Sequence, residues 1–326
     1  MRGPGVVSAV VALVFASGAA AQWRCESAIN IAQSTDAKVF YHLESAGRRN
    51  VAIDAETVAV TWEDNSNGTP TAWIALSRGG AFDGGPIRLS ATAAYEPTVV
   101  ATVDGFAVAW EEGGAVRLRF VELDGALGEP MVLAKDAVQV SLAAMRGEVV
   151  AVWSQVRGRA PVLRAARLSR DGKGWRKHAE SFVEPKALRS AQSYSSVAVS
   201  AATVHVAWED RREGHTRILY SHAGANLRFS APKTLNKIVQ RAGGAQYGRG
   251  PGAARPALAA WDKSGVVAVW LDKRDFEGGY DVYAARRSAT RLNWGPNEKV
   301  QDDFGEAIAH WHAAVAADVD ARVAVA

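Results

Sequence analysis

The sequence predicts an all-β chain folded as a six-bladed β-propeller with four-stranded blades. A short pattern ending in tryptophan recurs along the chain at intervals of 43 to 62 residues, and β-branched, alanine-rich runs surround each copy. A repeat of roughly 40–50 residues that holds several short strands is typical of propeller blades. The units do not show apolar residues at the helical spacing i, i+3, i+4 and i+7, which excludes a helical solenoid.

The tryptophan of each copy is expected to be structural. The copies read VAVTW, AVAW, VAVW, HVAW and VAVW and end at Trp62, Trp110, Trp153, Trp208 and Trp270; a last copy, RVAVA, ends at Ala326. An aromatic side chain at the end of a strand buries about 150–250 Å². We therefore expect these tryptophans to pack between neighbouring blades rather than against a ligand.

Each unit contains four predicted strands, and the tryptophan ends the second. A tight turn such as Asp104-Gly105 separates the first strand from the second, and a polar loop precedes the third. The predicted first strands include 51–53, 97–100, 197–199 and 257–260, the third strands 71–76, 116–120, 217–220 and 281–285, and the fourth strands 86–89, 130–133 and 299–300.

The first 21 residues are expected to be a signal peptide. Arg2 is followed by an apolar core at 6–16 and by small residues at 19–21, the order typical of a secretory leader. The core is shorter than the roughly 20 residues of a membrane span. Residues 22–326 would then be the mature propeller domain, secreted or periplasmic, without a membrane span.

The two ends of that domain are predicted to build the sixth blade together. Complete repeats lie at about 50–90, 96–134, 138–184, 195–239 and 256–301. Residues 27–43 read as blade-completing strands, with 38–43 (KVFYHL) as a fourth strand, and residues 312–326 read as a terminal half-blade. Joining the two would close the ring and remove exposed sheet edges.

Composition excludes several function classes. The formal net charge is +4 and charged residues are evenly scattered, which argues against nucleic acid as a partner. The single cysteine, Cys25, cannot form an internal disulfide. No Gly-x-Ser-x-Gly motif is present, and we expect no cofactor.

The turns after the third strands resemble the Asp-box of sialidases, Ser-x-Asp-x-Gly-x-Thr-Trp. They begin at Ser34, Ser169, Ser221 and Ser288, and the loops that begin at Trp208 and Trp270 resemble the W-x-D-x-R-x-G pattern of sialidase-like propellers (BNR repeats). The resemblance implies a six-bladed propeller with the Asp-boxes opposite the active face. It assigns Ser169 and Asp171 a turn-closing role, with their side chains bonded to nearby backbone N–H groups.

The same resemblance implies an exo-acting glycoside hydrolase with an arginine cluster, a Tyr/Glu nucleophile pair and an acidic Asp. Guanidinium groups suit a carboxylate-bearing substrate because they bind it in a bidentate manner. The family's Arg-Ile-Pro motif is missing from this chain. If the chain is nevertheless such an enzyme, the residues to test are Arg49, Arg249, Arg255, Tyr247 and Asp272.

Ligands of propellers bind where loops converge over the ring axis, so residues near the first-strand starts and the second-to-third loops are the site candidates. They are Arg49, Tyr95, Tyr194, Tyr247, Arg249, Arg255, Asp272, Arg274, His310 and His312. An acid recurs two residues after tryptophan at Asp64, Glu112, Asp210 and Asp272, which indicates a repeated structural role. His310 and His312 could begin a metal site, although no partner ligand is identifiable and we expect none.

Two functions from different classes remain open, together with a purely structural scaffold. The favoured hypothesis is a binding or interaction module for a glycan, an anionic small ligand or an extracytoplasmic protein. The alternative is the sialidase-type glycoside hydrolase with a diverged site.

Overall fold

The computed structural model confirms an all-β chain. It describes residues 28–32, 34, 36, 38–43, 49–54, 56–156, 158, 160–172, 174–184, 191–212, 216–237, 252–261, 265–274, 280–288, 293–300, 310–318, 320 and 322–326. The predicted signal peptide, Cys25, Tyr247 and Arg249 lie outside these residues. Within them there is no helix, and hence none long and apolar enough to cross a membrane.

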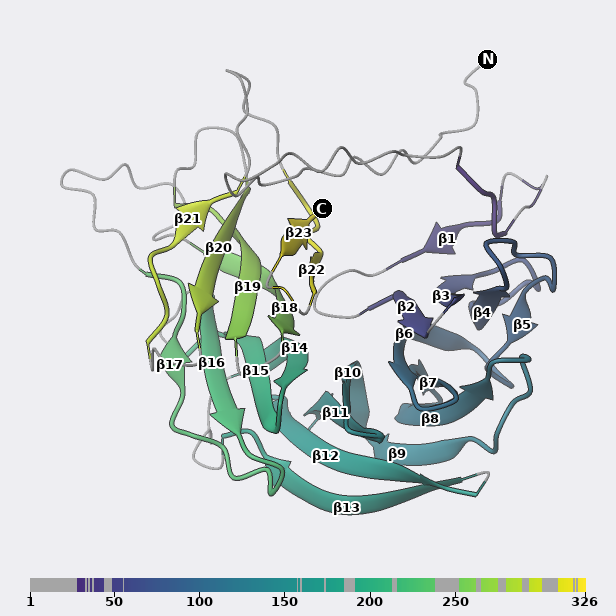
Figure 1. The fold of residues 1–326 in the computed structure, drawn as a ribbon, viewed down its shortest axis with the longest axis horizontal. Coiled ribbons are helices and arrows are strands. Elements are labelled where there is room, and N and C mark those ends of the chain that lie inside the picture. The colour runs from purple at the N-terminus through teal and green to yellow at the C-terminus, as the bar shows by residue number, and fades with distance from the viewer. Residues whose placement is uncertain are drawn as a thin grey trace.

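Antiparallel sheets are arranged around a common centre, as in a β-propeller (Figure 1). Blade I contains β1 (Tyr41–His42), β2 (Val51–Asp54), β3 (Thr57–Asp64), β4 (Thr71–Ser77) and β5 (Ile87–Arg88); blade II contains β6 (Ala94–Thr102), β7 (Gly105–Glu112), β8 (Ala115–Glu122) and β9 (Met131–Lys135); blade III contains β10 (Ala137–Met145), β11 (Glu148–Gln155), β12 (Val162–Asp171) and β13 (Gly174–Phe182).

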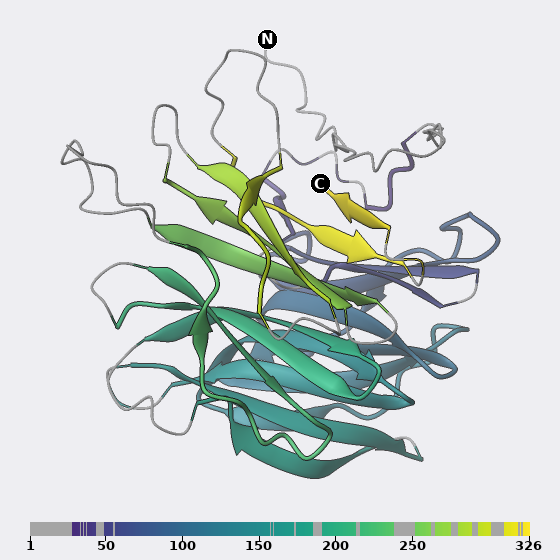
Figure 2. The same cartoon turned by 60° about the vertical axis from the view of Figure 1, so that its left-hand side comes forward.

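The later sheets continue this order. Blade IV contains β14 (Gln192–Ser200), β15 (Thr203–Asp210), β16 (Arg217–Ala223) and β17 (Lys233–Thr234); blade V contains β18 (Ala253–Trp261), β19 (Gly265–Asp272), β20 (Asp281–Arg287) and β21 (Glu298–Lys299); and a two-stranded sheet contains β22 (Val315–Ala317) and β23 (Val323–Val325). Figure 2 shows the blades from the side, stacked against one another.

The core lies between blades. Leu118 of blade II, Leu142 and Trp153 of blade III share one buried cluster, and equivalent clusters join the other neighbouring blades. All five repeat tryptophans are at most 4% exposed, as the sequence predicted. Because β-sheets bury side chains on both faces in such a stack, the second strands read as near-continuous apolar runs.

Each repeat tryptophan also carries a hydrogen bond to the side chain two residues later. The indole Nε1 of Trp62 donates to Asp64 at 2.7 Å, and that of Trp270 donates to Asp272 at 2.9 Å. The other three pairs are Trp110–Glu112 at 3.0 Å, Trp153–Gln155 at 3.2 Å and Trp208–Asp210 at 3.3 Å. A buried indole N–H needs a partner, so the recurring acid has the structural role expected from its repetition.

The predicted sixth blade zipped from both ends of the chain is wrong in its N-terminal half. Strand β1 pairs with β3, with Tyr41 opposite Asp64 and His42 opposite Glu63. These are the positions that Ala94 and Tyr95 occupy in blade II, opposite Glu112 and Glu111. Thus β1 and β2 are two halves of one inner strand of blade I, separated by residues 43–50, and β22–β23 pack against β18 without them.

The assigned Asp-box contacts also differ from the prediction. Ser169 Oγ lies 2.6 Å from His178 Nε2, and Asp171 forms an ion pair with Arg176 at 3.3 Å, so both side chains bind side chains of β13 rather than backbone N–H groups. The backbone bonding expected for such turns occurs in the first copy, where Ser34 Oγ accepts from the N–H of Asp36 at 3.1 Å.

A buried polar network joins blades IV and V. His205 is fully buried, with Nε2 at 2.7 Å from Ser200 Oγ and Nδ1 at 2.7 Å from the Tyr220 hydroxyl, which accepts from Arg287 Nη1 at 3.0 Å. Burial, with smaller effects from Arg287 and His222, lowers the pKa of His205 from 6.5 to about 3.

Removing one indole should measurably weaken the stack. Trp270→Phe leaves a gap in the interface and deletes the bond to Asp272, so we expect the free energy of unfolding to fall by about 2–3 kcal/mol in urea titrations. Trp311→Phe, at an exposed position, is the control and should change it by less than about 0.5 kcal/mol. Equal losses in both variants would contradict the interface role.

The His205 network predicts acid sensitivity. The pKa of His205 is lower in the folded chain than in the unfolded chain. As pH falls below 6.5, the unfolded chain therefore binds a proton at this histidine and the folded chain does not, which favours unfolding. Between pH 6.5 and 4.5 this difference should remove roughly 2 kcal/mol of stability. The His205→Gln variant should lose correspondingly less over the same range in urea titrations. Parallel losses in the two proteins would show that other groups cause the acid sensitivity.

Candidate functional site

A β-bulge interrupts each inner strand of blades II to V near its start. The pairing register shifts between Tyr95 and Thr98, and at the matching places in β10, β14 and β18. One residue in each bulge has a positive φ although it is not glycine: Glu96 (55°), Gln139 (57°), Tyr194 (49°) and Arg255 (54°). Such backbone costs of the order of 1–3 kcal/mol and persists only where surrounding groups hold it.

A side chain of the preceding blade holds each bulge. The residue directly after the repeat tryptophan accepts the bulge N–H in three blades: Glu63 from Glu96 at 2.7 Å, Glu111 from Gln139 at 2.6 Å, and Glu209 from Arg255 at 2.8 Å. We call these contacts the bulge bonds.

In blade III the residue directly after the repeat tryptophan is Ser154, and the side chain of Gln139 accepts the bulge N–H of blade IV in its place. Gln139 Oε1 accepts the N–H of Tyr194 at 2.9 Å, and the hydroxyl of Ser154 donates to the same oxygen at 3.1 Å. The four bulges are therefore held alike even where the sequence differs. What varies is the side chain that each bulge presents, which is acidic, amide, phenolic or cationic.

The bulge side chains of blades IV and V contact each other. The guanidinium carbon of Arg255 lies 3.9 Å from the centroid of the Tyr194 ring, an arrangement worth about 0.5–2 kcal/mol. Both side chains remain partly exposed. Tyr95, which directly precedes the bulge residue of blade II, is 44% exposed. Cationic and aromatic surfaces are thus offered together at the start of the inner strands.

His312 belongs to the same series. Val315 pairs with Val325 as Val99 pairs with Val108 in blade II, and His312 precedes Val315 by as many residues as Glu96 precedes Val99. His312 is exposed, whereas His310 is partly buried and donates its backbone N–H to the carbonyl of Tyr280 at 3.0 Å. No group of three or more His, Cys, Asp or Glu side chains that could hold a metal ion occurs in the described part of the chain.

Arg49 reaches from blade I to blade V. Its Nη2 donates to the carbonyl of Leu258 on β18 at 3.2 Å, while its own carbonyl accepts from the N–H of Val99 at 2.7 Å. Burial lowers the pKa of this guanidinium from its ordinary value. Among the described residues, the Leu258 carbonyl is the only hydrogen-bond acceptor of the Arg49 side chain. Arg49 is partly buried, and a guanidinium without a carboxylate partner can offer its other donors to an anion.

Two predicted site residues, Asp272 and Arg274, form an ion pair with each other. Asp272 is 1% exposed and accepts from both Trp270 and Arg274, whose Nη2 lies 2.6 Å from Asp272 Oδ2. Arg274 also donates to Asn297 at 3.1 Å and covers the ring of Tyr283 at 4.1 Å. These contacts hold the loop after β19, and blade IV repeats them with Asp210 and Arg212.

The structure therefore brings Arg49, Tyr194 and Arg255 to the inner strands of the ring, adds Tyr95 and His312 at the same end of those strands, and ties Asp272 to Arg274. Sequence reasoning missed the bulge residue Gln139 and the role of the acids in the bulge bonds. A signal was present, because the sequences TWED, AWEE and AWED place an acid directly after three of the five tryptophans.

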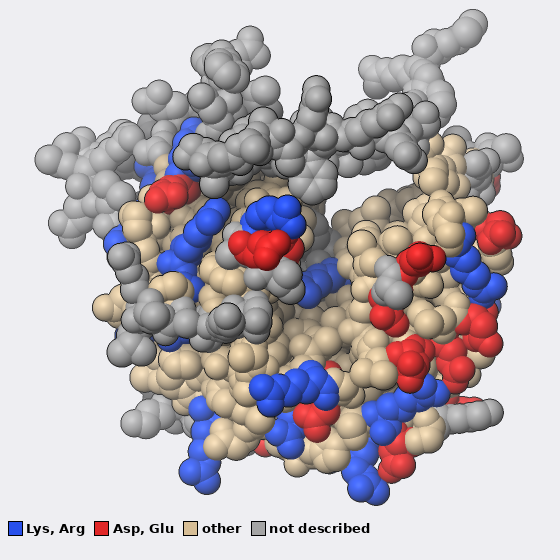
Figure 3. Space-filling model, viewed as in Figure 1, with Lys and Arg blue, Asp and Glu red and all other residues tan. Residues whose placement is uncertain are grey.

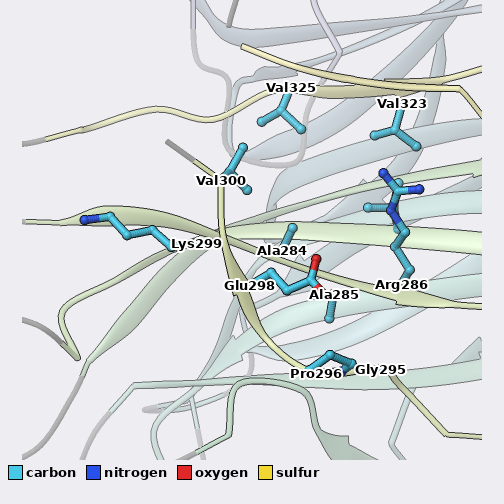
Figure 4. A pocket seen from close by; sticks show the side chains of 11 residues that line it. Ala284, Ala285, Arg286, Gly295, Pro296, Glu298, Lys299, Val300, Val323 and Val325 are labelled. Atoms are coloured by element: carbon cyan, nitrogen blue, oxygen red, sulfur yellow. The ribbon is translucent and has the colours of Figure 1, made fainter. Parts of the chain in front are cut away.

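Charge on the face seen in Figure 3 is mixed, and a hollow lies at its centre with a basic side chain at its wall. A pocket elsewhere lies between blade V and β23 (Figure 4), and its lining includes Val267, Ala284, Val300, Val323 and Val325 with Arg286 and Glu298 beside them. None of the predicted site residues lines it. Several of its valines belong to the cluster that packs β22–β23 on blade V, so it is a crease in that packing.

The bulge bond of blade V can be tested with a substitution that the chain itself uses in blade III. Glu209→Ala leaves the N–H of Arg255 without its acceptor, and we expect a loss of about 1–3 kcal/mol in the free energy of unfolding, measured by urea titration. Glu209→Gln should recover most of that loss, because Gln139 already does the same task with an amide oxygen. A glutamine variant as unstable as the alanine variant would contradict this role.

No protein-family model matches this sequence, and no curated protein sequence matches it. Similar solved structures include an oligogalacturonate lyase in complex with manganese (12% identity, TM-score 0.49, covering 87% of this chain and 70% of that one) and the fucose-specific lectin from Aleuria aurantia (10%, 0.49, 84% and 85%). Another is the endo-arabinase from Bacteroides thetaiotaomicron VPI-5482 (13%, 0.43, 70% and 87%).

Proposed function

We propose that this chain is a glycan-binding β-propeller that takes an anionic sugar at the inner-strand starts of its ring. The observation that carries the proposal is Arg49, a partly buried guanidinium that bridges blades I and V without a carboxylate among the described residues. A sugar carboxylate would satisfy its remaining donors, since guanidinium groups bind carboxylates through paired N–H donors.

The neighbouring stack supplies a second element of recognition. Arg255 and Tyr194 offer a cation and the plane of an aromatic ring within 3.9 Å of each other. Sugars present apolar C–H faces that pack on aromatic rings, with hydroxyl and carboxylate groups around the edge for charged partners. Because each bulge is held rigidly by its neighbour, this surface is ordered before any ligand arrives, which lowers the cost of binding.

Binding explains the acids of the site better than hydrolysis does. A glycoside hydrolase needs one carboxylic acid that can donate a proton and a second carboxylate placed for attack or for activation of water. Glu63, Glu111 and Glu209 each accept a backbone N–H of the next blade, so these carboxylates are engaged in holding the bulges. We therefore favour glycan binding over sialidase-type hydrolysis, and we keep the sialidase-like family assignment as part of that alternative. The expected signal peptide puts the binding site outside the cytoplasm.

Matched pairs of acidic and neutral glycans test the proposal. In isothermal titration, sialyllactose or trigalacturonate should bind the full chain, and lactose or maltotriose should bind far more weakly. Arg49→Ala and Arg255→Ala should each weaken binding of the acidic ligand by about 10- to 100-fold, the range for one charge-assisted contact. Arg176→Ala, which removes the same charge from an exposed position on β13, should leave binding unchanged.

The contrary outcomes are distinct. Equal binding of acidic and neutral glycans, or equal losses in Arg176→Ala and Arg255→Ala, would refute an anion site at the ring. Release of fluorophore from a fluorogenic sialoside by the unmodified chain, but not by Arg255→Ala, would support the hydrolase instead.

A further inference from the structure

Trp311 differs from every other described tryptophan because it is exposed. Its exposed fraction is 65%, the largest among the exposed apolar side chains, whereas the five repeat tryptophans are almost completely buried. A tryptophan left in water forgoes the burial of roughly 150–250 Å² that the other copies provide to the fold. Trp311 also lies directly before His312, at the same end of the inner strands as the bulge residues.

The ring of Trp311 is held in place although it faces solvent. It contacts the ring of Tyr280 edge-to-face, with centroids 5.9 Å apart and planes at 61°. The N–H of the preceding residue, His310, donates to the carbonyl of Tyr280 at 3.0 Å, and the ammonium of Lys273 lies 4.3 Å from the centroid of the Tyr280 ring. Ala313, two residues after Trp311, is 1% exposed and anchors this segment in the core.

This aromatic pair and the residue before Arg255 border the same apolar cluster. Ala254, directly before Arg255, and Tyr280 pack against the same apolar cluster, which contains Ala313. The backbone N–H of Lys273 donates to the carbonyl of Gly252 at 3.0 Å, which ties the loop beside Tyr280 to the start of β18. The Tyr194–Arg255 pair and the Tyr280–Trp311 pair therefore both lie beside the start of β18.

We propose that Trp311 and Tyr280 form a second sugar-binding platform, so that the ligand is an oligosaccharide that extends outward from the anion site. This inference rests on the proposed function. The platform would take the apolar face of a sugar ring beyond the one whose carboxylate meets the arginines. An ordered, exposed aromatic ring suits that contact because it provides area with little conformational entropy left to lose.

Galacturonate oligomers of graded length separate this platform from the anion site. In isothermal titration with the full chain, affinity should rise from the dimer to the tetramer. Trp311→Ala should weaken binding of the tetramer by about 5- to 10-fold and leave that of the dimer unchanged, whereas Arg255→Ala should weaken both. Trp311→Phe keeps an aromatic ring and should recover part of the loss, which guards against a folding defect.

Fluorescence gives an independent measure. The difference in acrylamide quenching between the unmodified chain and Trp311→Phe reports on Trp311, and the tetramer should reduce that difference while the dimer should not. If the dimer and tetramer bind equally well, or if Trp311→Ala binds the tetramer like the unmodified chain, the platform is refuted and the anion site stands. If no galacturonate oligomer binds the unmodified chain, the platform is refuted, and if sialyllactose does not bind either, the proposed function is refuted as well.

Discussion

The fold depends on how it satisfies one buried donor, the indole N–H of the repeat tryptophan. A large aromatic ring at a blade interface buries a large apolar area, but it takes a polar group into the core with it. An acid or amide two residues later accepts that N–H in all five copies. This pairing fixes the end of the second strand. The residue between the tryptophan and its acceptor points to the other side of the strand and can contact the neighbouring blade.

That neighbouring position links the scaffold to the site. Where it is glutamate it accepts the N–H of the next blade's bulge, as Glu63 does for Glu96, and blade III substitutes an amide from Gln139 for the same purpose. The repeated part of each blade thus supports a backbone conformation that is unfavourable alone. The residue placed there differs from blade to blade, so the ring can combine a phenol, a cation and an imidazole at one end without changing its frame.

The strands and their order could be predicted because they depend on local chemistry. Alternating β-branched runs, tight turns and the tryptophan that ends each second strand are written in consecutive residues. The position of Lys38 to Leu43 was predicted wrongly because two short segments share one edge of β3, and which segment pairs where depends on register rather than composition. Strand β1 completes the inner strand of blade I opposite Glu63 and Asp64, a choice made by partners distant in sequence.

The candidate site was predictable in part for the same reason. Arg49, Tyr194 and Arg255 stood out because they precede first strands, and the structure places all three at the inner strands of the ring. Asp272 and Arg274 were selected with them because an exposed ligand pair and a buried structural pair have the same residue types. Only the 1% exposure of Asp272 and its bond to Trp270 separate the two cases. Bulge residues such as Gln139 carry no motif, since a positive φ in a non-glycine residue follows from tertiary contacts.

The central claim is that a repeated frame holds unshared side chains at one end of the inner strands to bind an acidic glycan. A crystal structure of the chain with trigalacturonate tests it most directly. The account predicts a sugar carboxylate on the guanidinium of Arg49 and a sugar ring against Tyr194 and Arg255, with the bulge bonds unchanged. A sugar bound in the crease between blade V and β23, or on the turns that carry Ser169 and Asp171, would contradict it.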